Sequence, residues 1–201
     1  MTQHFKLEPR KRKGPRKVTQ NSIENAALYY LQRFSSSSEN FRKVMMRRVA
    51  RSAKYHNTSL EKGAEIVDQL ILRFIEVGLL DDLHFAKVQV ISYRRRGLSE
   101  RVIRARLMKK GLSIEVINDS LANIECDLED PELIASIIFS RKRRLGLFRE
   151  PADKLNRFLE KDLAKLARAG FSYHTAKQVV GAETKEELEE MVENSDFGQY
   201  K

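Results

Sequence analysis

Two octapeptides of the chain align at a constant offset of 59 residues, Arg106-Leu-Met-Lys-Lys-Gly-Leu-Ser113 with Lys165-Leu-Ala-Arg-Ala-Gly-Phe-Ser172, and the basic first residue, the leucine, the glycine and the serine recur in place. In each copy the glycine is typical of a helix end and the serine of the start of the next helix. A small helical unit of this kind cannot bury its own apolar face, so neighbouring units must stack. The repeat predicts an all-α protein, an elongated, curved array of three tandem three-helix repeats.

Apolar residues outside the octapeptide also recur at helical spacing. One face of a first helix is predicted to carry Ile23, Ala27, Tyr30, Leu31 and Phe34, and a loop is expected over Tyr55–Thr58. The alternation in Val88-Gln-Val-Ile91 would also suit a short strand, but the helices on either side favour a helix. A single compact all-α domain with a chance similarity is the alternative to repeats. The three repeats are predicted over residues 19–80, 81–127 and 128–182.

The two ends of the chain carry opposite charges. Six of the eight residues 10–17 are basic and a Gly-Pro pair interrupts any helix, so residues 1–18 are predicted to be a disordered basic tail. Residues 183–201 are predicted to be an acidic C-terminal tail. Seven acids accompany one lysine in residues 183–196, which suits a last polar helix that frays.

Charge and composition restrict the class of protein. The 201 residues include 38 Lys and Arg against 28 Asp and Glu, and the formal net charge of +10 indicates a polyanion or an acidic surface as partner. No apolar run approaches the roughly 18 residues of a membrane span. No apolar stretch follows the N-terminal charges, as it would in a secretory signal. The single cysteine, Cys126, excludes an intrachain disulfide and fits a reducing cytoplasm.

The sequence offers little that could catalyse a reaction or hold a metal. It has no glycine loop for a nucleotide, no zinc-protease motif and no paired cysteine motif, and its four histidines are scattered without ligand spacing. The adjacent carboxylates Asp81 and Asp82 follow Gly78 closely, which favours helix capping over metal binding. We therefore expect no enzymatic activity, no metal and no cofactor.

Basic side chains gather in clusters along the chain. The densest lies between Arg94 and Lys110, where eight cations accompany a single acid, Glu100. They cover the outward arc of a helix that Ser99 is predicted to cap and that turns Ile103 and Leu107 inward. Such an arc can follow a phosphate backbone without reading base sequence. The alternative is a solvated face whose charge is balanced by acids. For residues 42–51 this alternative and a binding role are about equally well supported. The run Arg141–Arg144 suits the end of a helix, where cations complement the helix dipole. The candidate binding residues are Arg94, Arg95, Arg96, Arg101, Arg104, Arg106, Lys109, Lys110, Arg42, Lys43, Arg47 and Arg48.

Two further stretches carry a resemblance to a known family. Gly78-Leu-Leu-Asp-Asp-Leu-His-Phe-Ala86 matches a GLLDD-x-x-FA signature. Arg96-Gly-Leu-Ser-Glu-Arg-Val-Ile-Arg-Ala-Arg-Leu-Met-Lys-Lys-Gly-Leu112 looks like an RG-x-x-x-x-x-I-x-x-x-L-x-x-KG segment. With its three-helix repeats, the chain resembles RecX, the bacterial family of regulatory proteins that modulate the RecA recombinase. The resemblance covers roughly residues 22–182 in architecture, with its specific motifs in residues 78–121.

The resemblance implies a non-enzymatic cytoplasmic regulator, expected to be a monomer, that lies in the helical groove of the RecA–DNA filament. It would bridge neighbouring subunits and restrain ATP hydrolysis, strand exchange and coprotease activity in recombination, DNA repair and the SOS response. Single- and double-stranded DNA would be contacted without sequence preference. In the family, basic residues of the repeats line the concave surface, and matching positions give that role to Arg96, Arg101, Arg104, Arg106, Lys109 and Lys110.

Two features depart from the family pattern. The link over Ser52–Lys62 is longer than the usual short turn, and the two charged tails are not core features. Two other functions stay open: a stand-alone DNA-binding protein with a helix-turn-helix at Leu107–Leu121, and a helical scaffold for another acidic protein. Footprinting on duplex DNA separates the first from a filament regulator, since a helix-turn-helix protein must prefer one short sequence.

Overall fold

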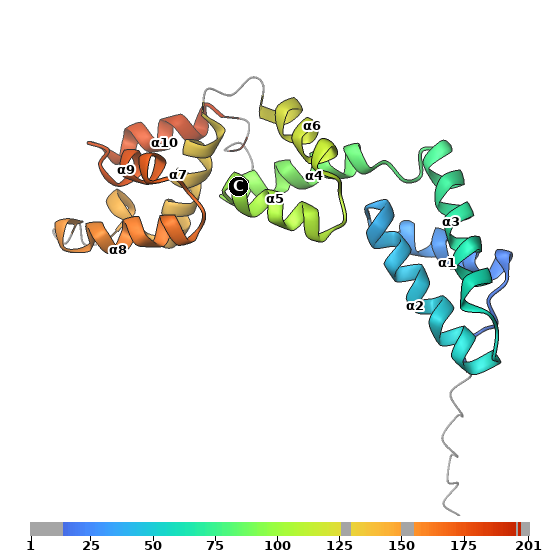
Figure 1. Ribbon diagram of the computed structural model, residues 1–201. Helices are drawn as coiled ribbons and strands as arrows, with labels where there is room; N and C mark the ends of the chain where they lie inside the picture. The colour runs from blue at the N-terminus through green and yellow to red at the C-terminus, as the bar shows by residue number, and fades with distance from the viewer. Residues whose placement is uncertain (1–13, 126–129, 150–154, 196, 198–201) are drawn as a thin grey trace, which may run out of the picture. The chain divides into compact units, whose positions relative to one another are not determined.

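The computed structural model describes residues 14–125, 130–149, 155–195 and 197. Over these residues the chain forms ten α-helices, one short 3-10 helix and no strand (Figure 1). The all-α fold is therefore confirmed, whereas the array of three tandem repeats stays a prediction. The chain divides into two compact units, an N-terminal unit of residues up to Ser35 with Asn40–Leu80, and a C-terminal unit of Ser36–Glu39 with residues from Asp81 onward.

The N-terminal unit is built from three helices around one apolar core. They are α1 (Gln20–Leu31), α2 (Ser38–His56), whose first two residues belong to the C-terminal unit, and α3 (Leu60–Glu76). The stripe predicted from the spacing is buried at Ile23 and Ala27 of α1, which share a core with Phe41 and Phe74, whereas Phe34 lies beyond the end of α1 and is exposed. The loop expected from residue 55 begins only at Asn57, since α2 runs two residues further. The long link of this repeat is therefore largely helix.

The segment before α1 lies against α2. The amide of Val18 donates to Ser52 Oγ at 3.0 Å, and the carbonyl oxygen of Pro15 lies 2.7 Å from His56 Nε2. The side chain of Val18 packs at the edge of the core. The disorder expected for the basic tail therefore does not extend to these residues, and residues 1–13 of the tail lie outside the described part of the chain.

Three helices also form the first half of the C-terminal unit. They are α4 (Asp82–Arg95), α5 (Glu100–Lys109) and α6 (Ile114–Glu125). Asp81 begins α4 as predicted, because its Oδ1 accepts a hydrogen bond from the amide of His84 at 2.8 Å. Residues 88–91, which also suited a strand, lie within α4. Ile103 and Leu107 of α5 are fully buried, as their spacing predicts, in a core shared with α4 and α6.

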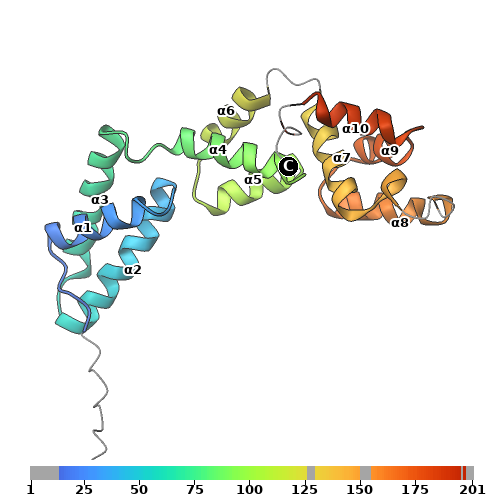
Figure 2. The same ribbon diagram turned by 180° about the vertical axis from the view of Figure 1, so that it is seen from behind.

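The second half of the C-terminal unit gathers the remaining helices (Figure 2). They are α7 (Pro131–Arg143), the 3-10 helix η1 (Gly146–Phe148), α8 (Leu155–Arg168), α9 (Tyr173–Val180) and α10 (Lys185–Glu193). Leu188 and Val192 of α10 are buried together with Phe197 in a core shared with α7. The acidic segment therefore contains a packed helix, which differs from the expected helix that frays. Cys126 lies outside the described residues.

A buried carboxylate on α8 fastens the 3-10 helix. Asp162 accepts hydrogen bonds from the amide of Gly146 at 3.1 Å, from Arg149 Nη2 at 2.6 Å and from Lys165 Nζ at 3.3 Å. Burial alone would raise the pKa of Asp162, but the hydrogen bonds from Arg149 and Gly146 outweigh it. The pKa of Asp162 therefore lies below its ordinary value of 3.8.

We expect Asp162→Asn to lower the free energy of unfolding by about 2 kcal/mol near neutral pH, because charge-assisted hydrogen bonds to the carboxylate are weakened. A folded-state pKa below the unfolded one stabilises the fold above the unfolded pKa, and this contribution disappears as the pH falls through the folded-state pKa. Urea unfolding at about pH 7 and about pH 3 measures the difference between wild type and variant. A difference that does not shrink in acid would contradict the role of Asp162.

Candidate nucleic-acid interface

The turn between α4 and α5 lies directly against α7 within the C-terminal unit. Gly97 in this turn has a φ of +74°, and a Cβ atom there would lie 2.7 Å from the amide nitrogen of Phe139 and 3.0 Å from the carbonyl oxygen of Ala135. Glycine is the residue that combines this backbone conformation with so close an approach to another helix. The Arg-Gly pair of the sequence motif therefore marks a packing contact.

Arg94 belongs to this packing contact and not to the surface. Its side chain is 0% exposed, and its Nη1 donates to Glu132 Oε2 of α7 at 2.6 Å and to the carbonyl oxygen of Leu98 at 3.3 Å. The expectation that Arg94 lies on a binding surface is wrong, because it follows the buried Val90 by about one helical turn. Glu132 also accepts from the amide of Glu100 at 3.0 Å, so a residue of α7 caps α5.

A serine at the start of α5 joins that helix to α8. Ser99 occupies the predicted N-cap position, but its Oγ donates to the carbonyl oxygen of Ala169 at 2.7 Å, just before the octapeptide glycine. A second bond of this kind lies in the same unit, where Ser37 Oγ donates to the carbonyl oxygen of Lys110, again just before an octapeptide glycine. The two copies of the octapeptide therefore take part in the same kind of contact, which we call the serine joint.

Five of the candidate cations lie on α5 or at its end, and they differ in exposure. Arg101, Arg106 and Lys109 are exposed, whereas Arg104 and Lys110 are half-buried. The guanidinium carbon of Arg106 lies 5.3 Å from the ring centroid of the buried Tyr93, a distance suited to a cation–π contact. The exposed three are therefore the members of this set that are best placed to meet a ligand.

Arg104 is engaged within its own unit. Its Nε lies 2.6 Å from Glu100 Oε1, and its Nη1 donates to Asn118 Oδ1 of α6 at 2.6 Å. Glu100, the single acid among the eight cations, thus neutralises the charge of Arg104 in particular. Arg104 ties α5 to α6, and a phosphate would compete with these two partners for it.

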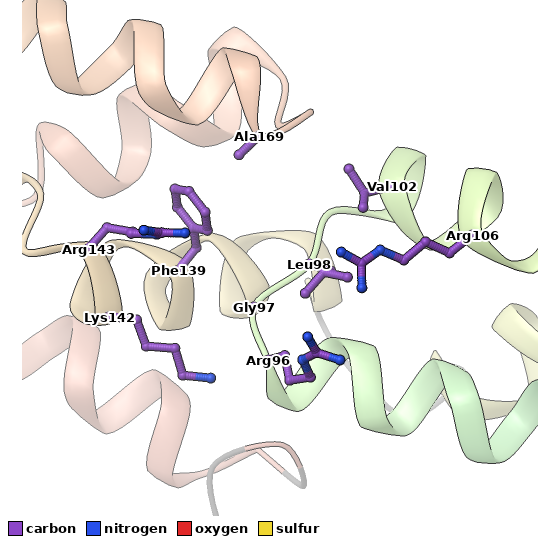
Figure 3. Close-up of a pocket in the computed structure, with 9 residues that line it drawn as sticks. All are labelled: Arg96, Gly97, Leu98, Val102, Arg106, Phe139, Lys142, Arg143 and Ala169. Atoms are coloured by element: carbon purple, nitrogen blue, oxygen red, sulfur yellow. The ribbon is translucent and has the colours of Figure 1, made fainter.

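A pocket rich in cations lies where the α4–α5 turn meets α7 and α8. Its volume is about 450 Å³. Arg96 and Arg106 stand on one side of it, and Lys142 and Arg143 stand on the other (Figure 3). The nine lining residues, none of them acidic, are Arg96, Gly97, Leu98, Val102, Arg106, Phe139, Lys142, Arg143 and Ala169.

The pocket contains two cations that the candidate set lacks. Lys142 and Arg143 belong to the basic run at the end of α7, which the sequence assigned to a helix end. Burial lowers the pKa of the Lys142 ammonium, and the nearby cations Arg141 and Arg96 lower it further. Lys142 Nζ donates to the main-chain carbonyl oxygen of Arg95 at 3.0 Å. Contact between α4 and α7, which sequence spacing does not reveal, brings these cations together.

The second candidate cluster lies on α2, in the N-terminal unit. Arg42 binds Asp68 of α3 through two hydrogen bonds, Nε to Oδ1 at 2.6 Å and Nη2 to Oδ2 at 3.0 Å. The hydrogen bond from Arg42 lowers the pKa of Asp68, although burial opposes it. Lys43, Arg47 and Arg48 are exposed. A role for this cluster in binding stays a prediction.

The chain is similar to bacterial proteins named "Regulatory protein RecX". It is 37% identical over 175 residues to the one of Myxococcus xanthus, which covers 87% of this chain and 92% of that protein. The chain belongs to the RecX family. It is 29% identical over 173 residues to the RecX of Agrobacterium fabrum (85% and 88% covered) and 35% identical over 125 residues to that of Mycobacterium sp. strain JLS (62% and 67%). No family model and no solved structure matches it.

The predicted resemblance to RecX is therefore confirmed. The two motifs that carry it stabilise the fold. Asp81 of the first motif caps α4, and Gly97 and Ser99 of the second connect α5 with α7 and α8. In the described part of the chain no group of His, Cys, Asp and Glu is arranged to hold a metal ion. No helix in that part is both long and apolar enough to cross a membrane.

Proposed function

We propose that this RecX-family protein binds the groove of the RecA–DNA filament and regulates RecA, mainly by inhibiting its ATP hydrolysis, strand exchange and coprotease activity. It acts in the cytoplasm as a monomer, without enzymatic activity of its own and without a cofactor. Its roles lie in recombination, DNA repair and the SOS response. Membership of a family of named regulatory proteins supports this function, and the exposed cations of α5 are the observation on which the proposed contact with the filament rests.

The exposed cations suit a regular polyanion. Arg101, Arg106 and Lys109 are exposed on α5, whereas Arg94 and Arg104 are engaged with carboxylates of the protein itself. Exposed cations attract phosphates without reading base sequence, and such binding weakens steeply as salt rises. Binding to single- and double-stranded DNA without sequence preference is therefore part of the proposal.

The two serine joints support a modular arrangement. The Ser37 and Ser99 bonds use the same chemistry at corresponding glycines of the octapeptide. A filament offers the same groove again and again, so a modular ligand can add several modest contacts through linkage. This argument favours a filament over a single protein surface as the partner.

The protein should slow DNA-dependent ATP hydrolysis by RecA when it is added in substoichiometric amounts. Arg101→Glu combined with Lys109→Glu should inhibit about tenfold more weakly, because two attractive contacts with phosphate become repulsive. A steady-state ATPase assay over a range of regulator concentrations gives the half-inhibitory concentration of each form.

The matched control is Lys177→Glu combined with Lys185→Glu, which changes the net charge equally at exposed positions of α9 and α10. This control should inhibit like the wild type. Absence of inhibition by equimolar wild type would contradict the regulator, and equal loss in both variants would contradict the α5 surface. A footprint on one short duplex sequence would favour the stand-alone DNA-binding protein.

A further inference from the structure

The pocket between the α4–α5 turn and α7 brings together four cations, which repel one another when no anion lies between them. We propose that it binds one phosphate group of a single DNA strand through Arg96, Arg106, Lys142 and Arg143. This inference rests on the proposed function and deepens it, because it names one point of contact with nucleic acid. It also adds Lys142 and Arg143 to the residues that the sequence indicated.

The charge of the pocket lacks a counterpart in its own walls. Four of the nine lining residues are cations and none is an acid. Lys142 is held among these charges by its bond to the carbonyl oxygen of Arg95, although Arg96 and Arg141 disfavour its protonated form. A phosphate with its formal negative charge relieves this repulsion, and its oxygens accept the donors that line the pocket.

The wall beside the cations is apolar. Leu98, Val102 and Phe139 line the pocket, and Figure 3 shows their side chains in the space between α5 and α7. A deoxyribose or an unstacked base can lie on such a wall while its phosphate meets the cations. In a duplex the bases are stacked inside, so this combination favours a single strand.

The two sides of the pocket are fixed before a ligand arrives. Gly97 packs on the backbone of α7, and the ion pair of the buried Arg94 with the half-buried Glu132 spans the same contact. The cations of α4 and α5 are therefore held opposite those of α7. A site that needs no rearrangement loses less affinity to ordering.

Replacing two cations of the pocket tests the proposal. Lys142→Gln combined with Arg143→Gln should raise the Kd for a fluorescent oligothymidine about tenfold in the full-length protein. The slope of log K against log salt should fall by about 0.7, the contribution of one phosphate contact on a single strand. Fluorescence anisotropy at several salt concentrations measures both quantities, and thermal unfolding shows that the variant is folded.

The control is Arg141→Gln combined with Arg144→Gln, which removes the same charge from the same run at exposed positions outside the pocket. It should change the Kd less than about threefold. Equal weakening by both pairs would overturn the pocket in favour of diffuse attraction, and so would no weakening by either pair.

Pyrophosphate separates a DNA strand from a free anion as the source of the phosphate. Pyrophosphate at millimolar concentration should displace the oligothymidine only in part. If pyrophosphate instead binds the wild type at micromolar concentration and the pocket variant loses this binding, the pocket takes a free anion and the proposed DNA strand is overturned. The RecA ATPase assay keeps the two proposals apart. If the wild type binds DNA through the pocket but does not inhibit RecA, only the proposed function fails; if it inhibits RecA while both pairs bind DNA alike, only the pocket fails.

Discussion

Glu132→Ala should lower the free energy of unfolding of the C-terminal unit by about 3–5 kcal/mol, because it takes the carboxylate partner away from a buried charge. Arg94 is 0% exposed and its Nη1 lies 2.6 Å from Glu132. The same substitution also removes the acceptor for the amide of Glu100 at the start of α5. Urea unfolding followed by circular dichroism measures the loss, with the midpoint and the slope both fitted.

An exposed ion pair of the same unit is the control. Glu100→Ala removes the carboxylate that lies 2.6 Å from Arg104, where the side chains are 31% and 42% exposed. A pair this exposed contributes at most about 1 kcal/mol. Replacing both partners, Arg94→Met with Glu132→Leu, should recover most of the stability because the buried charge of Arg94 is removed together with its partner. If Glu132→Ala costs no more than Glu100→Ala, the buried pair is not what holds α7 to the α4–α5 turn.

The case of Arg94 shows where sequence reasoning reaches its limit. A basic residue in a basic run is expected at the surface, and the neighbours Arg95 and Arg96 gave no sign that Arg94 differs. Its burial depends on Glu132, which is 38 residues away in the chain. A charge can be buried when a partner is supplied by another helix, and spacing along one helix does not show that partner.

Elements with local causes were predicted well. Asp81 caps α4 because a short side chain can reach the amide of His84, and this bond depends on adjacent residues alone. The buried positions Ile103 and Leu107 follow from helical periodicity in the same way. The acidic C-terminal segment that forms α10 is the contrasting case, since it also carries Leu188 and Val192 at helical spacing. Charge dominated the interpretation there, but two apolar side chains suffice to pack the helix.

The pocket required contacts between distant segments. The sequence shows Lys142 only as one member of a basic run, because its proximity to Arg96 depends on how α7 packs against the α4–α5 turn. The sequence signal that could have found it is the Arg-Gly pair itself. A glycine is the residue that permits a close approach of backbone, and at Gly97 the approach to α7 brings Lys142 near the preceding Arg96.

Gly97→Ala should destabilise the C-terminal unit by about 2–5 kcal/mol, since a left-handed backbone costs an alanine roughly 1–2 kcal/mol and a steric clash adds about 1–3. The new methyl group would lie 2.7 Å from the amide nitrogen of Phe139 and 3.0 Å from the carbonyl oxygen of Ala135. Both atoms belong to the backbone of α7, so α7 and the turn must move apart. Thermal and urea unfolding measure the loss of stability.

Gly78→Ala isolates the clash from the backbone conformation. Gly78 has nearly the same φ, +73°, but no atom lies within 4 Å of a Cβ atom at that position. It should therefore cost only about 1–2 kcal/mol. Because separation of the turn from α7 also moves Arg96 away from Lys142, Gly97→Ala should weaken oligothymidine binding at a temperature where both variants are folded, and Gly78→Ala should not. Equal costs for the two substitutions would mean that α7 yields easily to the turn, and the two sides of the pocket would then not be fixed in advance.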